Sequence, residues 1–388
     1  MPQIPRIGLF IESSRASGRA LLQGIARFAH RQTRWSFYWE PGGLEKVWPQ
    51  LRSLDLSGII LRDVDQLEEV LAMGVPAVVV GHSKTEVTGL VNVVTDSDTI
   101  GCMAAEHLIA CGFQNFAYCG LENTPLENAP WSKERKMAFC ERLKRASQTC
   151  HVYPTTSPVP QTWPQERRSM VRWLQALPRP LGLMACNDDR AQQVLEACKL
   201  ADLPVPDAVG LIGVDNDEVV CGLSDPQLSS VAVNFERSGF EAAQALDSMI
   251  RGKRTRAMRI EVPATHVVAR RSTDFVAADD KQLARALRCI RDHAPVGRLG
   301  VAEVAREAGL SRRALERRFR SEIGTSIQKY IRKVRVGHIA RLLVETHLSI
   351  SQIAESLGFV DVQHFARYFR ADKGMSPLAY RKAYATPM

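Results

Sequence analysis

The stretch GFVDVQHFARYFRADKGMSPLAYRK (358–382) decides how the last part of the chain folds. Gly358 stands where a chain leaving a helix needs a positive φ angle, and Asp361 is a good cap for a following helix. Aromatic residues then recur at three- and four-residue spacing, which predicts one buried helix face. These aromatics are Phe365, Tyr368 and Phe369, with Phe359 sealing the turn; the opposite face carries Gln363, His364 and Arg367.

An earlier segment repeats this pattern. VAEVAREAGLSRRALERRFR (301–320) and ISQIAESLGFVDVQHFARYFR (350–370) share an alanine in a first helix, a glycine-apolar turn, a capping residue and an apolar residue four before Phe. Each copy predicts a helix-turn-helix unit, because the glycine ends one helix and Ser311 or Asp361 caps the next. The exposed side of the second helix in the first copy carries Arg312, Arg313, Glu316 and Arg317.

The region around the two copies favours DNA as the partner. Residues 326–346 between them predict an amphipathic helix of about 20 residues, roughly 30 Å long. One turn of B-DNA is about 34 Å, so both copies could enter successive major grooves on one face. From Asp279 to the end the chain has 21 Lys and Arg against 11 Asp and Glu, whereas the remainder has 30 against 31. The basic excess therefore belongs to the region that would meet a polyanion.

The first 270 residues alternate short apolar runs with helical patterns, which predicts parallel sheets covered on both faces. The predicted strands are 7–11, 58–62, 77–81, 116–120, 182–186 and 210–214. Ligands of such folds bind beyond the carboxyl ends of the strands. The polar residues there are Glu12, Ser13, Ser14 and Arg15, then Asn187 and Asp188, then Asp215 and Asn216. They could hydrogen-bond hydroxyl groups, or Asn187 and Asp215 could merely cap helices.

This part resembles the sensor domain of the LacI/GalR family, which is similar to periplasmic sugar-binding proteins with two α/β lobes around a cleft. The matching stretches include RIGLFIESSRASGRALLQGI (6–25), ERKMAF (134–139), ACNDDRAQQVLEA (185–197) and DLPVPDAVGLIGVDNDE (202–218). The resemblance implies sugar contacts from Arg135, Asn187 and Asp215. It also implies an aromatic ring against the sugar, for which Trp163 is the first candidate and Trp131 the second.

The C-terminal region resembles the DNA-binding domain of the AraC/XylS family. Residues Gly358 to Arg381 fit its pattern G-F-x5-F-x-R-x-F-x4-G-x2-P-x2-Y-R. The resemblance implies base contacts from Arg313, Glu316 and Arg317 in the first unit and from Gln363, His364 and Arg367 in the second. Arg312 and neighbouring basic residues are expected to meet phosphates or to pack.

Other protein classes find little support in the sequence. The nine cysteines form no C-x-x-C pair, and none has histidines at ligand spacing, so no metal and no cofactor is predicted. No signal peptide and no membrane span is present, which indicates the cytoplasm. The chain also lacks G-x-S-x-G, a P-loop and a helix-opening G-x-G-x-x-G, which disfavours an enzyme.

The sequence therefore predicts a two-lobed α/β sensor (1–273), a linker (274–280) and an all-α domain with two helix-turn-helix units (281–388). As a whole, the chain resembles the bacterial xylose operon regulators. This resemblance implies a sugar-responsive transcription activator that binds D-xylose and operator DNA, forms a homodimer and works with RNA polymerase. A repressor, or a response to another pentose or a polyol, stays open.

Overall fold

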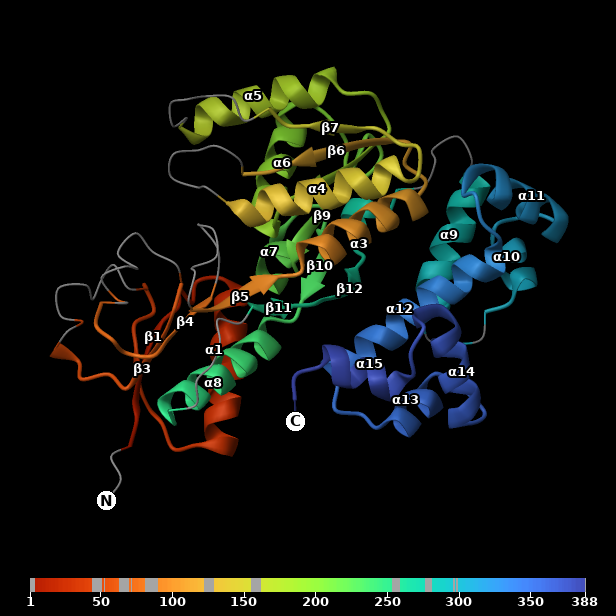
Figure 1. Ribbon diagram of the computed structural model, residues 1–388. Coiled ribbons are helices and arrows are strands. Elements are labelled where there is room, and N and C mark those ends of the chain that lie inside the picture. Colours follow the sequence, from red (N-terminus) through yellow and green to blue (C-terminus); the bar gives the residue numbers. More distant parts are fainter. Residues whose placement is uncertain are drawn as a thin grey trace.

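The computed structural model describes residues 4–43, 51, 53–62, 70, 72–80, 90–121, 129–154, 162–252, 259–275, 281–295, 297 and 299–387. Figure 1 shows two α/β lobes, one after the other, and a helical domain beside them. Within the described ranges, no helix is long and apolar enough to cross a lipid bilayer.

The first lobe is built on a sheet with strand order β11-β5-β4-β3-β1-β2, and all of its described pairs are parallel. The strands are β1 (Arg6–Phe10), β2 (Ser36–Trp39), β3 (Gly58–Leu61), β4 (Ala77–Val80), β5 (Val91–Thr95) and β11 (Arg259–Val262). Two helices, α1 (Ala16–Gln32) and α8 (Phe235–Ile250), pack against each other and against one face of this sheet. The inner strands β3 and β4 are continuous apolar runs, because both faces of a parallel sheet are buried there.

The second lobe has the strand order β12-β10-β9-β8-β6-β7, in which β12 runs antiparallel to β10. Its strands are β6 (Asn115–Cys119), β7 (Cys150–Val152), β8 (Leu181–Ala185), β9 (Val209–Asp215), β10 (Ser229–Val233) and β12 (Ala264–Val268). One face is covered by α3 (Ser97–Ala110) and α4 (Pro130–Lys144), the other by α5 (Trp163–Ala176) and α6 (Asp188–Leu200). A short helix, α7 (Glu218–Leu223), follows β9.

Three segments carry the chain between the lobes: β5 leads into α3, β10 into α8, and β11 into β12. These hinge crossovers are residues 95–97, 233–235 and 262–264. They are hydrogen-bonded to one another, since the amide of Asp96 donates to the carbonyl of Val262 at 2.9 Å and that of Asn234 to Pro263 at 3.2 Å. A rotation of one lobe against the other must therefore move all three together.

The apolar runs that predicted strands are confirmed as β1, β3, β4, β6, β8 and β9. The other strands were missed because polar residues interrupt or shorten their apolar pattern. In β10, for example, Ser229 and Ser230 are completely buried, which hydrophobic periodicity cannot reveal.

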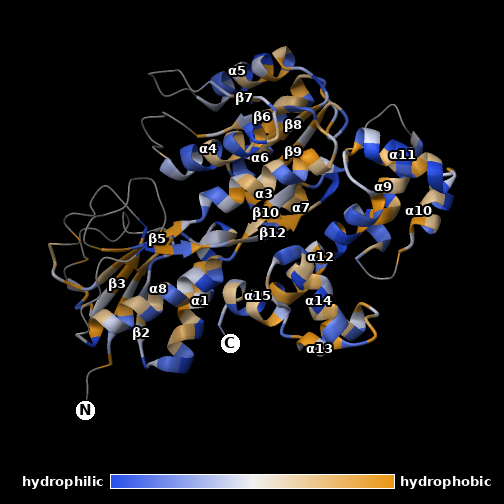
Figure 2. Cartoon of the chain, turned by 45° about the vertical axis from the view of Figure 1, so that its right-hand side comes forward, coloured by the Kyte–Doolittle hydropathy of each residue, from blue (hydrophilic) through white to orange (hydrophobic). Residues whose placement is uncertain are grey.

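The helical domain contains α9 (Lys281–His293), α10 (Val301–Glu307), α11 (Arg312–Glu322), α12 (Ile327–Glu345), α13 (Ile350–Ser356), α14 (Val362–Lys373) and α15 (Pro377–Tyr384). Both predicted units are confirmed, as α10 with α11 and α13 with α14. Gly309 and Gly358 have φ angles of +66° and +69°. The side chains of Ser311 and Asp361 cap the second helices. In α14 the buried residues are Phe365 and Phe369, and Figure 2 places this helix beside α12 and α15.

The helical domain has two cores, joined by α12. Residues of its first half pack with α9, α10 and α11, whereas residues of its second half pack with α13, α14 and α15. The segment predicted as a linker begins inside the second lobe. Phe275 is buried and stacks on Phe113, with 4.2 Å between the ring centroids. Residues 276–280 of that segment lie outside the described ranges.

Candidate functional site

A cavity of about 330 Å³ lies between the two lobes, at the carboxyl ends of their strands. The first lobe and the crossovers contribute Glu12, Arg15, Ser17, Leu21, Arg62, Val80, Val93, Thr95, Phe235 and Val262. The second lobe contributes Trp131, Arg135, Asn187, Asp188, Asp189, Asp215, Asp217 and Val220. The first side thus offers apolar and polar groups in equal number, whereas the second offers mainly charged ones. This combination suits a ligand with hydroxyl groups and an apolar ring face.

Arg135 is the buried cation of this cavity, with only 3% of its surface exposed. Its guanidinium donates to the carbonyl of Cys186 at 2.6 Å and lies 3.6 Å from Asp215 Oδ1. It also stacks on the ring of Trp131, 4.7 Å from the centroid. Burial raises the pKa of Asp215, and the nearby Arg135 and Arg62 oppose that rise. The predicted residues Arg135 and Asp215 are therefore neighbours.

Asn187 performs the capping role that the sequence had left open, because its side-chain oxygen accepts the amide of Arg190 at 2.9 Å. Asn187 also lines the cavity, and the cap does not use its side-chain nitrogen. Asp215 caps no helix; it ends β9 with a φ angle of 100°, and Asp217 caps α7 instead. Asn187 can therefore cap a helix and also contact a ligand. Of the two roles considered for Asp215, the structure leaves ligand contact as the candidate.

Beside them, the buried carboxylate of Asp188 is held by donors from three directions. It accepts the hydroxyl of Ser230 at 2.6 Å, the amide of Asp217 at 2.8 Å and the thiol of Cys221 at 3.5 Å. Burial, assisted by Asp215, raises the pKa of Asp188 to about 8. Since its oxygens are engaged with these donors, Asp188 supports the floor of the cavity.

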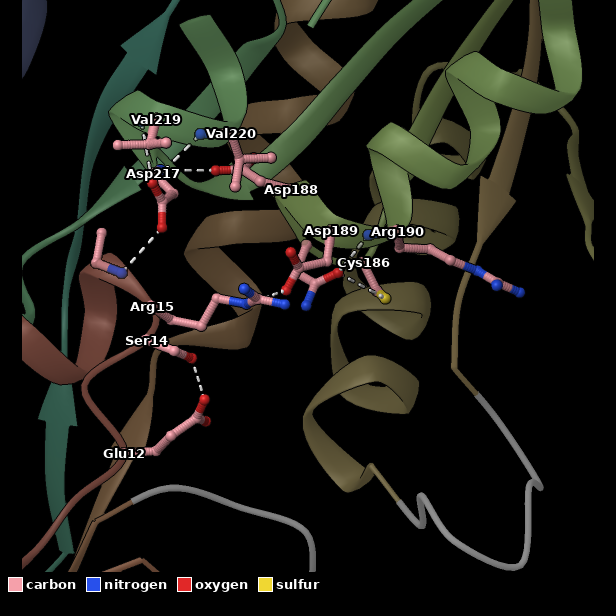
Figure 3. A network of polar contacts seen from close by, with 12 residues as sticks. Glu12, Ser14, Arg15, Cys186, Asp188, Asp189, Arg190, Asp217, Val219 and Val220 are labelled. Atoms are coloured by element: carbon pink, nitrogen blue, oxygen red, sulfur yellow. Dashed lines mark hydrogen bonds and ion pairs between the residues drawn. The ribbon is translucent and has the colours of Figure 1, made fainter. Parts of the chain in front are cut away.

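Two polar contacts join the lobes across the mouth of the cavity (Figure 3). Arg15 donates to the carboxylate of Asp189 at 2.8 Å, and the amide of Ala16 donates to Asp217 at 2.9 Å. Within the loop after β1, the hydroxyl of Ser14 donates to the carboxylate of Glu12. Arg15, predicted from its place after the first strand, therefore lies where lobe closure would form or break a contact.

Several polar atoms of the cavity residues are buried without a hydrogen-bond partner among the described residues. They are Arg62 Nε, Thr95 Oγ1, Arg135 Nε and Asp215 Oδ1. An unpaired buried polar group costs about 1–3 kcal/mol. Donors and acceptors stand together here, which matches hydroxyl groups, because each hydroxyl both donates and accepts.

The structure places the two tryptophan candidates differently. Trp131 lines the cavity, whereas Trp163, at the start of α5, is not among the residues that line it. Arg62 and Thr95 were missed. Arg62 was placed inside the predicted strand 58–62, whereas the observed β3 ends at Leu61 and leaves Arg62 just beyond its carboxyl end, where the strand-end rule applies. Thr95 could not be found that way because its strand was not predicted.

The DNA-facing candidates of the first unit are all exposed on α11: Arg312, Arg313, Glu316 and Arg317. Leu315 and Phe319 on the other side of the helix are completely buried. Arg312 pairs with Glu316 at 2.9 Å. Arg318 is half-buried and donates to Gln282 at 3.1 Å, so it supports the unit from inside.

In the second unit, Gln363, His364 and Arg367 are exposed on α14. The ring of His364 packs edge-on against Phe359, with 5.6 Å between the centroids. Phe365 and Phe369 are fully buried. Two arginines of α12 hold this core in place: Arg335 stacks on Phe359 at 4.5 Å, and Arg332 on Tyr368 at 4.8 Å.

The second unit is also fastened to the hinge crossovers. Asn234, in the crossover from β10 to α8, donates to the carbonyl of Tyr384 and accepts the hydroxyl of Thr386 at 3.3 Å. Arg237 donates to the carbonyls of Lys382 and Ala383. Both views place the end of the chain between α15 and the first lobe (Figures 1 and 2).

More contacts join this unit to β12. The hydroxyl of Tyr380 donates to the carbonyl of Thr265 at 2.9 Å, and His266 lies 3.2 Å from the carboxylate of Glu345. Tyr380 and His266 are buried. The last helix and the end of α12 thus rest on the segments that must move when the lobes rotate.

Comparison with known proteins covers the whole chain. A family model for a periplasmic binding protein-like domain matches residues 105–273, and one for a helix-turn-helix domain matches residues 304–383. The xylose operon regulatory protein of Escherichia coli K12 is 30% identical over 97% of this chain and 96% of its own. The chain belongs to the family of xylose operon regulatory proteins. The member from Haemophilus influenzae is 28% identical over 98% of each chain.

Solved structures agree with this family. The structure of the xylose-binding transcription activator xylR is 29% identical, covers 99% of each chain and superposes with a TM-score of 0.62. A transcriptional regulator CelR in complex with cellobiose is 20% identical over 70% of this chain and 86% of its own, with a TM-score of 0.55; it shows the fold of the sensor alone. The chain is therefore a sugar-responsive, DNA-binding transcription regulator and not an enzyme.

Proposed function

We propose that this protein activates transcription in response to D-xylose. The observation that carries the proposal is the interlobe cavity, which combines apolar side chains with buried polar atoms that have no hydrogen-bond partner among the described residues. The chain is related over 97% of its length to a xylose operon regulatory protein. At about 330 Å³ the cavity is at the small end of ligand sites, which favours a monosaccharide.

The cavity residues take distinct roles in this proposal. Asp215 accepts hydrogen bonds from two sugar hydroxyls, which charge makes stronger than neutral ones. Arg135, oriented by Cys186 and Trp131, donates to a hydroxyl or the ring oxygen. The amide of Asn187 is a further donor, and Trp131 or Phe235 covers the apolar face of the sugar.

Sugar binding controls DNA binding through the hinge crossovers. A sugar that touches both lobes stabilises their closed arrangement. Closure shifts the crossover residue Asn234, to which Tyr384 and Thr386 are bonded, relative to β12, to which Tyr380 is bonded. The second helix-turn-helix unit then changes its position relative to the lobes. The sugar can shift this equilibrium only by the difference between its affinities for the two states.

The DNA partner is an operator, read by α11 and α14 in adjacent major grooves. Activation implies recruitment of RNA polymerase, and the family resemblance implies a homodimer. Sedimentation of the full chain with and without D-xylose tests the dimer; a monomer bound to a complete operator would rule it out.

The effector is tested by calorimetric titration of the full chain with D-xylose, L-arabinose, D-ribose and xylitol. We expect measurable heat of binding for D-xylose and at least tenfold weaker binding of the others. Asp215→Ala should abolish the heat, whereas Trp163→Ala should keep it. Tighter binding of another pentose would mean that this pentose, and not D-xylose, is the effector. Repression of a promoter by the protein would contradict the proposed activation.

A further inference from the structure

The two recognition helices differ at the positions that enter a major groove first. The first, second and sixth residues of such a helix lie on one side near its N-terminal end, which contacts the base edges. In α11 these residues are Arg312, Arg313 and Arg317, whereas in α14 they are Val362, Gln363 and Arg367. The corresponding positions are fixed by the caps Ser311 and Asp361 and by the buried Phe319 and Phe369.

Val362 was not among the predicted DNA contacts, and its environment sets it apart. It leaves 39% of its surface exposed at the first position of α14, although the core of the unit lies directly beneath the helix. Neighbouring residues on the outer face are polar or charged, namely Gln363 and Arg367. Its counterpart Arg312 can pair with Glu316 or with DNA, whereas a valine offers neither charge nor hydrogen bond.

We propose that Val362 contacts the 5-methyl group of a thymine, so that the second unit reads a base by an apolar contact. This rests on the proposed binding of operator DNA. Thymine is the one base that presents a methyl group in the major groove, and apolar side chains recognise it there. Gln363 beside it suits adenine, and Arg367 one turn later suits guanine. The first unit, with arginines at all three positions, favours guanines.

The test removes the methyl group without changing base pairing. Duplexes are selected from a random 40-base-pair library with the full-length protein and D-xylose, and each thymine of an enriched duplex is replaced singly by uracil. We expect one replacement to weaken binding by about fourfold, the loss of roughly one buried methyl group. Val362→Ala should bind thymine and uracil equally at that position, and Val362→Thr, which keeps a methyl group, should still distinguish them.

Val360→Ala is the matched control, because Val360 is 81% exposed in the turn before the helix. It should retain the preference for thymine. Enriched duplexes without a uracil-sensitive position, or the same sensitivity in Val362→Ala, would overturn the role of Val362 and leave operator binding intact. A library from which no sequence is enriched would instead overturn operator recognition, and this proposal with it.

Discussion

The two helix-turn-helix units use the same scaffold for different purposes. Each has a glycine with positive φ in its turn, a side-chain cap and two buried residues four apart on the second helix. The first exposes a row of arginines. The second exposes fewer charges, and the helix α15 that packs on it is bonded to β12 through Tyr380 and to the crossover residue Asn234 through Tyr384.

This difference suggests that the two units divide two tasks: the first contributes more to DNA affinity, and the second responds to the angle between the lobes. Contacts with phosphates give affinity with little sequence preference, and exposed arginines that flank the reading face of the first unit, such as Arg320, are suited to them. Helix α9, which packs in the core of the first unit, also touches the sensor, through the ion pair of Arg291 with Asp274. The second unit rests where the lobes join, so its position depends on their angle.

Breaking either core should have the largest effect and should show whether the units fold separately. Phe365→Ala and Phe319→Ala each empty a completely buried site and should cost about 3–5 kcal/mol of unfolding free energy. Because the two phenyl rings belong to separate cores, each variant should lose operator binding but retain D-xylose binding by calorimetry. Loss of sugar binding in Phe365→Ala would contradict independent cores.

Exchanging the exposed arginines for alanine sharpens the comparison of DNA contacts. Arg317→Ala and Arg367→Ala should each cost about 1–3 kcal/mol on a selected operator and relax preference at one base pair, because each guanidinium can bond a guanine in two places. Fluorescence anisotropy on single-base variants of the operator measures this. An equal loss on random DNA would mean that the arginine contacts phosphate.

The salt dependence of binding should separate the units further. Arg320→Gln removes an exposed charge that flanks the reading face of α11, and should lower the slope of log K against log salt by about one. Gln363→Ala in the second unit should leave the slope unchanged while altering base preference. Equal slopes for both variants would argue against a division between phosphate contacts and base recognition.

Removing one hydroxyl tests the attachment of the second unit. Tyr380→Phe loses the hydrogen bond to the carbonyl of Thr265 and should reduce the coupling between sugar and DNA by about 1 kcal/mol, roughly fivefold. Tyr330→Phe changes a buried tyrosine of the first core and should leave the coupling as it is. DNA titrations with and without D-xylose compare the two, and a smaller coupling in Tyr330→Phe would place the route in the first unit.

A further expected effect concerns pH, near the attachment of the first unit. Burial, with nearby Lys333 and Arg291, lowers the pKa of His107 to about 3, and its ring bonds to Thr273 at 2.8 Å. The folded chain keeps this ring neutral, while the unfolded chain protonates it below about pH 6.5. Unfolding free energy should therefore fall as pH drops from 6.5 toward 3, by about 1 kcal/mol per pH unit.

Chemical denaturation between pH 5 and 7 measures this loss. His107→Gln should flatten the profile, because glutamine does not titrate. An identical slope in the variant would assign the pH dependence to other groups.

Local patterns in the sequence predicted much of this molecule. The turn glycines and caps of both units depend on neighbouring residues, and so do the apolar strands β1, β3 and β4. The cavity was predicted in part, since Arg135, Asn187 and Asp215 follow strands or match a family motif. Thr95 was not, because the polar residue Asn92 interrupts the apolar pattern of its strand.

Contacts between distant segments were beyond the reach of the sequence. Tyr380 and Thr265 are 115 residues apart and carry no shared pattern, so the docking of α15 on β12 could not be foreseen. Trp163 is the opposite case: its type and place suggested the cavity, but the start of α5 does not bring it there. Packing of whole elements decides such placements.

The most direct test of the coupling between sugar and operator is a paired titration of the full chain. Operator affinity is measured with and without D-xylose, and D-xylose affinity with and without operator, for the natural chain and for Asp215→Ala. We predict that each ligand tightens the other by the same factor, as linkage requires, and that Asp215→Ala removes this factor while retaining basal DNA binding. Operator affinity that D-xylose leaves unchanged in the natural chain would contradict the account.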